Sequence, residues 1–280
     1  MESLVTTAWL EQELGASDLR IVDATKLGPD LGRDARAEYE AGHIPGAVFM
    51  DLDELIDSAN PIENMAPSAE KFASRMQTLG LGDGSRIVLY DDSPWHTSAR
   101  AWWLLTLFGA HDVAILDGGI AKWKAEGRAL DEGKHSLRHR HFTVWKDNKL
   151  VRTKEQMLAN LDSKAEEVVD ARPAKRFTGE EADPRPGIEP GHIPGSKNVP
   201  QDRMFTADGV WKQEDGIRAT FEEAGVDLDK PMVATCGSGI TACVLAFGAH
   251  RLGKSDWAVY DGSWAEWGGD PATPKATGAA

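Results

Sequence analysis

The sequence has few cysteines, no long apolar stretch and a deficit of positive charge. Only two cysteines occur among 280 residues, which excludes a small secreted scaffold held together by disulfides. No apolar run approaches the ~20 residues that a membrane-spanning helix needs, and the first residues lack the basic segment and apolar run of a signal peptide. We therefore expect a protein of a reducing compartment, the cytoplasm.

The formal net charge is −14, which argues against nucleic acid or an anionic membrane surface as a partner. An anionic small substrate would have to be attracted by arginines placed close to its site. Apolar residues make up 41% of the chain, enough for a sizeable core, and 280 residues suffice for one large domain or two ordinary ones.

The chain contains two copies of one sequence pattern. Four segments, RIVDA, AGHIPGAVFMDL, SRIVLYD and AILDGGIAKW, return in the same order as EVVDA, PGHIPGSKNVPQ, KPMVATC and AVYDGSWAEW, with offsets of 147, 149, 145 and 144 residues. Conserved order and spacing of this kind indicate a duplicated domain. We predict an N-terminal domain over residues 1–135, a linker over 136–150 and a C-terminal domain over 151–280.

Each copy alternates short apolar runs with helical segments. The expected buried strands are residues 19–23, 86–90, 113–116, 167–170, 231–235 and 257–260. The expected helices include residues 98–108, 154–161, 216–224 and 240–251. This alternation predicts an α/β fold in which each domain is a parallel sheet with helices on both faces. Ligands of such sheets bind beyond the carboxyl ends of the strands.

Cys236 lies at this functional edge, directly after a predicted strand and before the glycine-rich turn GSG. A turn from strand to helix lets several backbone N–H groups converge, and the helix N-terminus adds a partial positive charge. Both effects favour a thiolate over a thiol. The matching position of the first copy is Asp91, so only the second copy carries a nucleophile. Cys243 falls in the apolar run ACVLAF and is expected to be structural.

The two HIPG motifs, the paired DGG and DGS motifs and the loop CGSGITA resemble those of the rhodanese superfamily. The resemblance covers nearly the whole chain and implies two tandem rhodanese-like domains. It implies an enzyme that moves sulfur from 3-mercaptopyruvate to an acceptor through a persulfide on Cys236, releasing pyruvate. Thioredoxin, small thiols and cyanide are the implied acceptors. No cofactor and no metal ion are expected.

The choice of sulfur donor depends on the residues after the cysteine. Members of the family that use thiosulfate carry basic residues there, whereas this chain has Gly237 and Ser238. That difference favours 3-mercaptopyruvate, with a thiosulfate:cyanide sulfurtransferase as the alternative. A non-catalytic rhodanese-like binding module is a second alternative, although such modules usually lose the cysteine.

The resemblance also implies roles for residues outside the nucleophile. Arg176 and Arg185 match two arginines that bind the carboxylate and the carbonyl of the substrate, as suits the bidentate geometry of arginine. The backbone of Gly237, Gly239, Ile240 and Thr241 is expected to cradle the transferred sulfur.

A proton relay of Asp, His and Ser is proposed for the family. Asp53 and Ser238 match two of its members, but Asn64 stands where the family has histidine and cannot shuttle a proton as imidazole does. His96 is a possible substitute. His43 and His192 occur in both HIPG copies, so we expect them to stabilise turns rather than to catalyse.

Two other kinds of site also use a cysteine in a loop, the active site of a phosphatase and a metal site. A Cys-x5-Arg phosphatase would need arginine at the position that Ala242 occupies. A metal site would need further His or Cys ligands, and Cys236 and Cys243 lack ligand spacing. A phosphatase and a metal site are therefore both disfavoured.

Overall fold

The computed structural model describes residues 1–279, which fold into two compact units. The first unit comprises Met1–Ile56, Ala66–Asp147 and Asp208–Val210. The second comprises Asp57–Met65, Asn148–Ala207 and the chain from Trp211 onwards. Residues 57–65 thus come from the first sequence repeat but contact the second unit.

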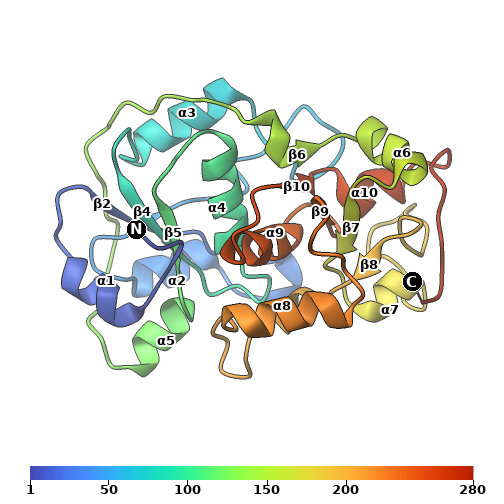
Figure 1. Cartoon of the computed structure of the whole chain (residues 1–280). Helices are drawn as coiled ribbons and strands as arrows, with labels where there is room; N and C mark the ends of the chain where they lie inside the picture. The colour runs from blue at the N-terminus through green and yellow to red at the C-terminus, as the bar shows by residue number, and fades with distance from the viewer. Residues whose placement is uncertain (280) are drawn as a thin grey trace. The chain divides into compact units, whose positions relative to one another are not determined.

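The first unit contains a five-stranded parallel sheet in the order β1-β5-β4-β2-β3. Its strands β2, β4 and β5 are labelled in Figure 1. Its strands are β1 (Leu4–Val5), β2 (Leu19–Asp23), β3 (Val48–Phe49), β4 (Arg86–Tyr90) and β5 (Val113–Leu116). Its helices are α1 (Thr7–Glu13), α2 (Ala35–Ala41), α3 (Ala69–Thr78), α4 (Ser98–Leu107) and α5 (Gly119–Ala125), with a 3-10 turn η1 (Pro29–Leu31).

The second unit repeats this architecture, with a five-stranded parallel sheet in the order β6-β10-β9-β7-β8. Its strands are β6 (Val151–Arg152), β7 (Glu167–Asp170), β8 (Lys197–Asn198), β9 (Met232–Thr235) and β10 (Trp257–Tyr260). Its helices are α6 (Lys154–Ser163), α7 (Ala174–Thr178), α8 (Glu214–Glu223), α9 (Ala242–Arg251) and α10 (Ser263–Trp267), with 3-10 turns η2 (Asn148–Leu150) and η3 (Gln201–Met204).

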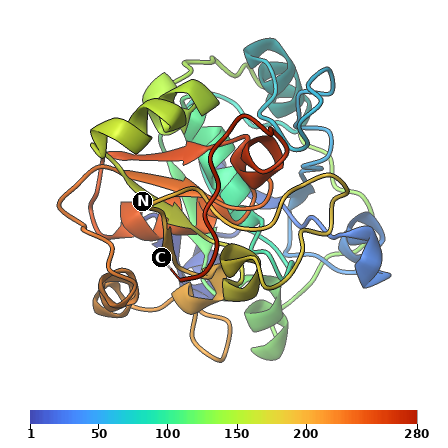
Figure 2. The ribbon, with the colours of Figure 1, turned by 90° about the vertical axis from the view of Figure 1, so that its right-hand side faces the viewer.

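Helices cover both faces of the second sheet. In two views α6 and α10 lie on one side of the strands and α8 lies on the other (Figures 1 and 2). Met157 of α6 and Trp264 of α10 pack into one buried cluster with Val233 of β9. The central strands β7 and β9 are buried almost throughout, as expected for strands covered on both faces. The predicted fold class, two tandem α/β domains with parallel sheets, is confirmed.

Sequence capping signals explain several helix boundaries. Thr153 and Gln156 form a reciprocal capping box at the start of α6, in which each side chain accepts from the other residue's backbone N–H. The Asp34 carboxylate accepts from two N–H groups of the first turn of α2. No helix of the described chain is long and apolar enough to span a lipid bilayer.

Candidate active site around Cys236

Cys236 directly follows β9, and a loop over residues 236–241 connects it to α9. The Cys236 side chain is buried, and the residue is only 2% exposed. Among the described residues, no hydrogen-bond acceptor is found for the amide N–H groups of Gly237, Ser238, Ile240 and Thr241. Gly239 adopts a φ of 79°, in the left-handed region that glycine occupies without strain. The loop therefore offers several unoccupied N–H donors beside one thiol.

The start of α10 fixes the direction of the peptides on either side of Gly237. The Trp264 N–H donates to the Cys236 carbonyl at 2.9 Å, and the Ala265 N–H donates to the Gly237 carbonyl at 2.8 Å. In a planar trans peptide the C=O and N–H groups point in opposite directions. The N–H groups of Gly237 and Ser238 therefore point away from α10, which leaves them available to an anion in the loop.

Ser263 completes this attachment and was not identified from the sequence. Its hydroxyl accepts a hydrogen bond from the Cys236 N–H at 3.1 Å and donates one to the Tyr260 carbonyl at 2.8 Å. The residue is fully buried, and its φ of 49° is unusual for a residue other than glycine. The repeat carried a signal for it, because the first copy has Gly119 at the matching place.

The first unit fills the corresponding loop with its own carboxylate. Asp91, which replaces the cysteine, accepts hydrogen bonds from the N–H groups of Ser93 at 2.9 Å and Ser98 at 2.8 Å. Ser98 begins α4, so the carboxylate sits at the N-terminus of that helix, where negative charge is favourable. The loop of the first unit thus binds an anion that its own side chain supplies.

Cys243 is the second residue of α9 and is completely buried. Its thiol donates a hydrogen bond to the Gly239 carbonyl at 3.2 Å. Cys243 therefore helps to hold the loop that carries Cys236, in agreement with the structural role expected from the sequence.

Arg185 reaches the loop backbone. Its Nη1 donates to the Gly237 carbonyl at 2.7 Å. A Cβ atom at Gly237 would lie only 3.2 Å from the Arg185 Nη2, so the glycine makes room for the guanidinium. This contact adds a permanent positive charge to the loop that contains the thiol.

A buried carboxylate orients Arg185. Asp183, whose side chain is 3% exposed, binds Nε and Nη2 of Arg185 at 2.7 Å each and also accepts from its backbone N–H at 3.0 Å. Burial disfavours the charge on Arg185, but the hydrogen bonds and attraction from Asp183 and Glu63 together outweigh it, and the pKa of Arg185 lies above its ordinary value. Burial alone would raise the pKa of Asp183, but its hydrogen bonds with Arg185 and the charge of Arg185 lower it below its ordinary value. Asp183 was not identified from the sequence.

The structure gives Arg176 a different setting from Arg185. Arg176 lies in α7, is partly exposed and pairs with the Glu181 carboxylate at 2.9 Å. Ser238 and Thr241 are both partly exposed in the loop, whereas Ile240 is buried. The substrate-binding roles of these residues stay predictions.

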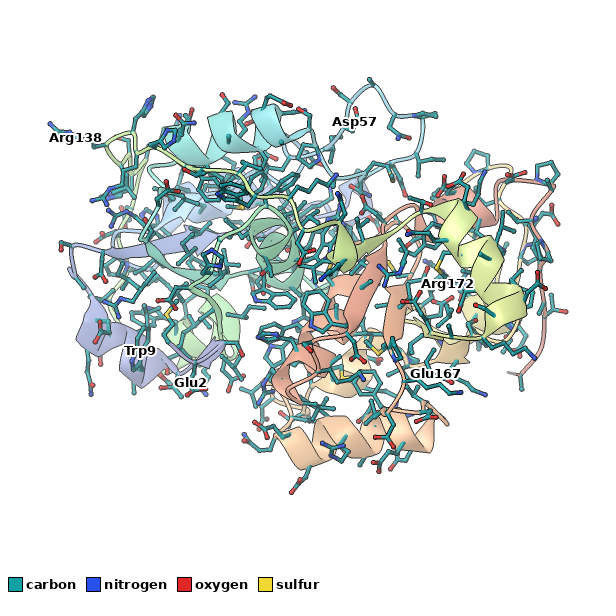
Figure 3. The ribbon with its side chains drawn as sticks, turned by 45° about the horizontal axis from the view of Figure 1, so that its top comes forward. Glu2, Trp9, Asp57, Arg138, Glu167 and Arg172 are labelled. Atoms are coloured by element: carbon teal, nitrogen blue, oxygen red, sulfur yellow. The ribbon has the colours of Figure 1, made fainter. Side chains whose placement is uncertain are left out.

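Arg172, a third arginine of the second unit, is fully engaged within that unit. It binds the buried Asp170 carboxylate through Nε and Nη2, at 2.7 Å for the shortest contact, and donates to the Gly191 carbonyl at 2.8 Å. Its guanidinium also lies 4.5 Å from the ring centre of Trp264. The side chain, labelled in Figure 3, is buried, and it stabilises the fold rather than presenting its charge at the surface.

The residues of the predicted relay belong to different units. Asp53 is in the first unit, where its carboxylate is exposed and pairs with Lys26. Asn64 and Ser238 are in the second. Asn64 and His96 both adopt a positive φ, 59° and 49° respectively. The relay role of Asp53 and Ser238 remains a prediction.

The two HIPG histidines are buried and hold backbone in place. His43 donates from Nδ1 to the Tyr39 carbonyl at 2.8 Å, and His192 donates to the Phe177 carbonyl at 2.9 Å. Each ring stacks on the side chain of its acceptor residue. Burial lowers the pKa of His192, which keeps the ring neutral. Within residues 1–279 no three or more His, Cys, Asp or Glu side chains are grouped to hold a metal ion.

Comparison with known proteins agrees with the duplicated architecture. The family described as the rhodanese-like domain matches residues 6–126 and again residues 153–270. The 3-mercaptopyruvate sulfurtransferase of Mus musculus is 44% identical over 271 residues, covering 95% of this chain and 91% of that protein. The thiosulfate sulfurtransferase of Gallus gallus is 40% identical and covers 95% of this chain and 93% of that protein.

Solved structures give the same result. The 3-mercaptopyruvate sulfurtransferase SseA of Escherichia coli superposes with a TM-score of 0.86 at 35% identity, covering 94% of this chain and 99% of that one. The Tum1 protein of Saccharomyces cerevisiae has a TM-score of 0.87 at 26% identity, covering 95% and 94% of the two chains. The fold of both units agrees with the paired sequence motifs and with the two family matches. The chain therefore belongs to the rhodanese family, with one rhodanese-like domain in each repeat.

Proposed function

We propose that the protein is a 3-mercaptopyruvate sulfurtransferase that carries sulfur as a persulfide on Cys236. The observation that carries this proposal is the setting of that thiol, buried beside free backbone N–H donors and an arginine bound to the loop. The name of the mouse relative and that of the Escherichia coli structure support it.

The first half-reaction forms the persulfide. The Cys236 thiolate attacks the sulfur of 3-mercaptopyruvate, an S–S bond forms, and the C–S bond breaks with its electron pair going to carbon. Pyruvate leaves as its enolate and takes up a proton. In this proposal the N–H groups of Gly237 and Ser238 stabilise the negative sulfur, first of the thiolate and then of the persulfide.

The second half-reaction returns the enzyme to its starting state. An acceptor thiolate, or cyanide, attacks the outer sulfur of the persulfide and releases the Cys236 thiolate. We propose thioredoxin or a small thiol as the acceptor, and a reducing compartment such as the cytoplasm as the location. Both cysteines are free thiols, which suits such a compartment.

In this proposal the arginines bind the donor. Arg185 is fixed by Asp183 and touches the loop, so its guanidinium holds a substrate carboxylate close to Cys236. Arg176 lies on α7 with a more exposed partner, Glu181, and we assign it to the substrate's carbonyl or carboxylate. Asp53 and Ser238 are assigned to proton transfer.

Thiosulfate is the competing donor. The chicken thiosulfate sulfurtransferase is nearly as similar to this chain as the mouse enzyme is. The loop nevertheless contains no basic side chain between Cys236 and Cys243, which disfavours a small dianion.

The test is steady-state sulfur transfer with 3-mercaptopyruvate and with thiosulfate in parallel. Pyruvate is followed with the first donor, and thiocyanate is followed with both when cyanide is the acceptor. A kcat/KM tens of times higher for 3-mercaptopyruvate is the expected result. A preference for thiosulfate would overturn the donor assignment, and an inactive wild-type protein would favour a binding module.

A further inference from the structure

A carboxylate from the first sequence repeat lies on the substrate-binding arginine. Glu63 belongs to residues 57–65, which contact the second unit; Asp57, where this segment begins, is labelled in Figure 3. The Oε1 of Glu63 accepts a hydrogen bond from Nη1 of Arg185 at 2.9 Å. The segment therefore brings a negative charge to the guanidinium that touches the Cys236 loop.

Four of the five N–H groups of the Arg185 guanidinium donate to three acceptors, and the fifth is the second N–H of Nη2. Asp183 takes Nε and Nη2, and Nη1 serves both the Gly237 carbonyl and Glu63. A guanidinium has five N–H groups in a fixed planar fork. A further carboxylate can bind Nη1 in this plane only if one of the present acceptors leaves.

The three acceptors differ in how easily they leave. Asp183 is 3% exposed, makes two side-chain bonds and accepts from the Arg185 backbone. The Gly237 carbonyl is part of the loop. The Glu63 carboxylate is 51% exposed and makes one contact, and exposed pairs of this kind contribute little stability. Glu63 is therefore the exchangeable acceptor.

We propose that Glu63 occupies the place on Arg185 that the carboxylate of the donor takes, so that substrate binding exchanges one carboxylate for another. The proposal rests on the function proposed above. Glu63 leaves into solvent when the substrate arrives and returns when pyruvate leaves. It raises the KM of an anionic donor and assists release of the anionic product, while the charge of the Arg185 cluster stays the same.

The test compares Glu63→Gln with a control of equal charge change. Glu223→Gln serves as the control, because Glu223 also pairs with an arginine, Arg203, is 64% exposed and belongs to the same unit. In Glu63→Gln we expect the KM for 3-mercaptopyruvate and the inhibition constant for pyruvate to fall together, by roughly 2- to 5-fold as befits an exposed ion pair. The control leaves both unchanged.

A second readout needs no turnover. Iodoacetate and iodoacetamide alkylate the same thiol, but only iodoacetate carries a carboxylate. Freeing Arg185 should raise the rate ratio of iodoacetate to iodoacetamide at Cys236 by roughly 2- to 5-fold, with no change in the control. The modified cysteine is assigned by peptide mass spectrometry, and Cys236→Ser gives the background.

These readouts separate the two proposals. An unchanged alkylation ratio in Glu63→Gln, or a rise in the KM, overturns the carboxylate exchange. If the wild-type protein fails to use 3-mercaptopyruvate, the proposed function fails, and the alkylation ratio still decides whether Glu63 competes for Arg185.

Discussion

Replacing Ser263 by alanine tests how the reactive loop is held in place. The Ser263 hydroxyl is the hydrogen-bond acceptor of the Cys236 N–H at 3.1 Å, and the residue has no exposure to solvent. Alanine would leave that buried N–H without its acceptor. An unsatisfied buried donor costs about 1–3 kcal/mol, and the loss of the bond to the Tyr260 carbonyl adds to it.

Replacing Ser263 by glycine separates the hydroxyl from the backbone strain. Serine here adopts a φ of 49°, and Gly119 occupies the matching position of the first unit at 55°. Both variants lose the hydroxyl, but glycine relieves about 1 kcal/mol of left-handed backbone strain. We therefore expect Ser263→Gly to be more stable than Ser263→Ala by that amount, and less stable than the wild type.

The assays are scanning calorimetry and steady-state sulfur transfer. The free-energy loss corresponds to a decrease in Tm of roughly 3–10 °C for Ser263→Ala in a domain of this size. Because the loop backbone is released, kcat/KM should fall roughly 10- to 100-fold in both variants. The reasoning is refuted if both variants keep wild-type kcat/KM, or if glycine is more destabilising than alanine.

Four further predictions concern other residues. Cys236→Ser should abolish turnover, whereas Cys243→Ser should retain most of it because a hydroxyl can still donate to the loop; equal losses in both would contradict these roles. Arg185→Ala should raise the KM for 3-mercaptopyruvate more than it slows release of sulfur from a preformed persulfide. Pre-steady-state kinetics measures that release, and a slower release with an unchanged KM would contradict the assignment. Burial raises the pKa of Asp23 to about 6, so its ionised form destabilises the fold above pH 6 and this cost disappears as the pH falls; Asp23→Asn should stabilise the protein by about 3 kcal/mol at pH 8 and by little at pH 4. Asp170→Asn, at the matching position of the second unit, should instead destabilise the protein by about 3–5 kcal/mol because it leaves a buried arginine unpaired. Calorimetry of both variants between pH 4 and pH 8 tests these signs, and a destabilised Asp23→Asn at pH 8 or a stabilised Asp170→Asn would contradict them.

The central strands could be predicted closely, because apolar runs between turns mark strands buried on both faces. Residues 19–23, 86–90, 113–116, 167–170 and 257–260 form strands with these bounds. The two-residue edge strands carry no such pattern.

Helix boundaries that depend on the geometry of a loop were harder to predict from the sequence. The α9 helix begins at Ala242 rather than at the predicted residue 240, because the chain turns at Gly239, whose φ is 79°. Short helices such as α7 and α10 are too brief to show a periodic pattern.

The residues of the candidate site could likewise be predicted only in part. Cys236, its glycines and Arg185 could be proposed from motif and resemblance, and Arg185 does contact Gly237. The repeat marks the position of Ser263 but not its hydrogen bond to Cys236, which is 27 residues away in sequence. Glu63 could not be proposed, since it lies 122 residues from Arg185 in sequence. Only the folded path of the chain brings such residues together.

The most direct test of the central claim is mass spectrometry of the protein after reaction with 3-mercaptopyruvate in the absence of an acceptor. We expect a mass gain of one sulfur atom on Cys236, one equivalent of pyruvate released, and loss of the added sulfur when cyanide or a thiol is supplied. No added sulfur on Cys236, or pyruvate formed equally by Cys236→Ser, would contradict the account.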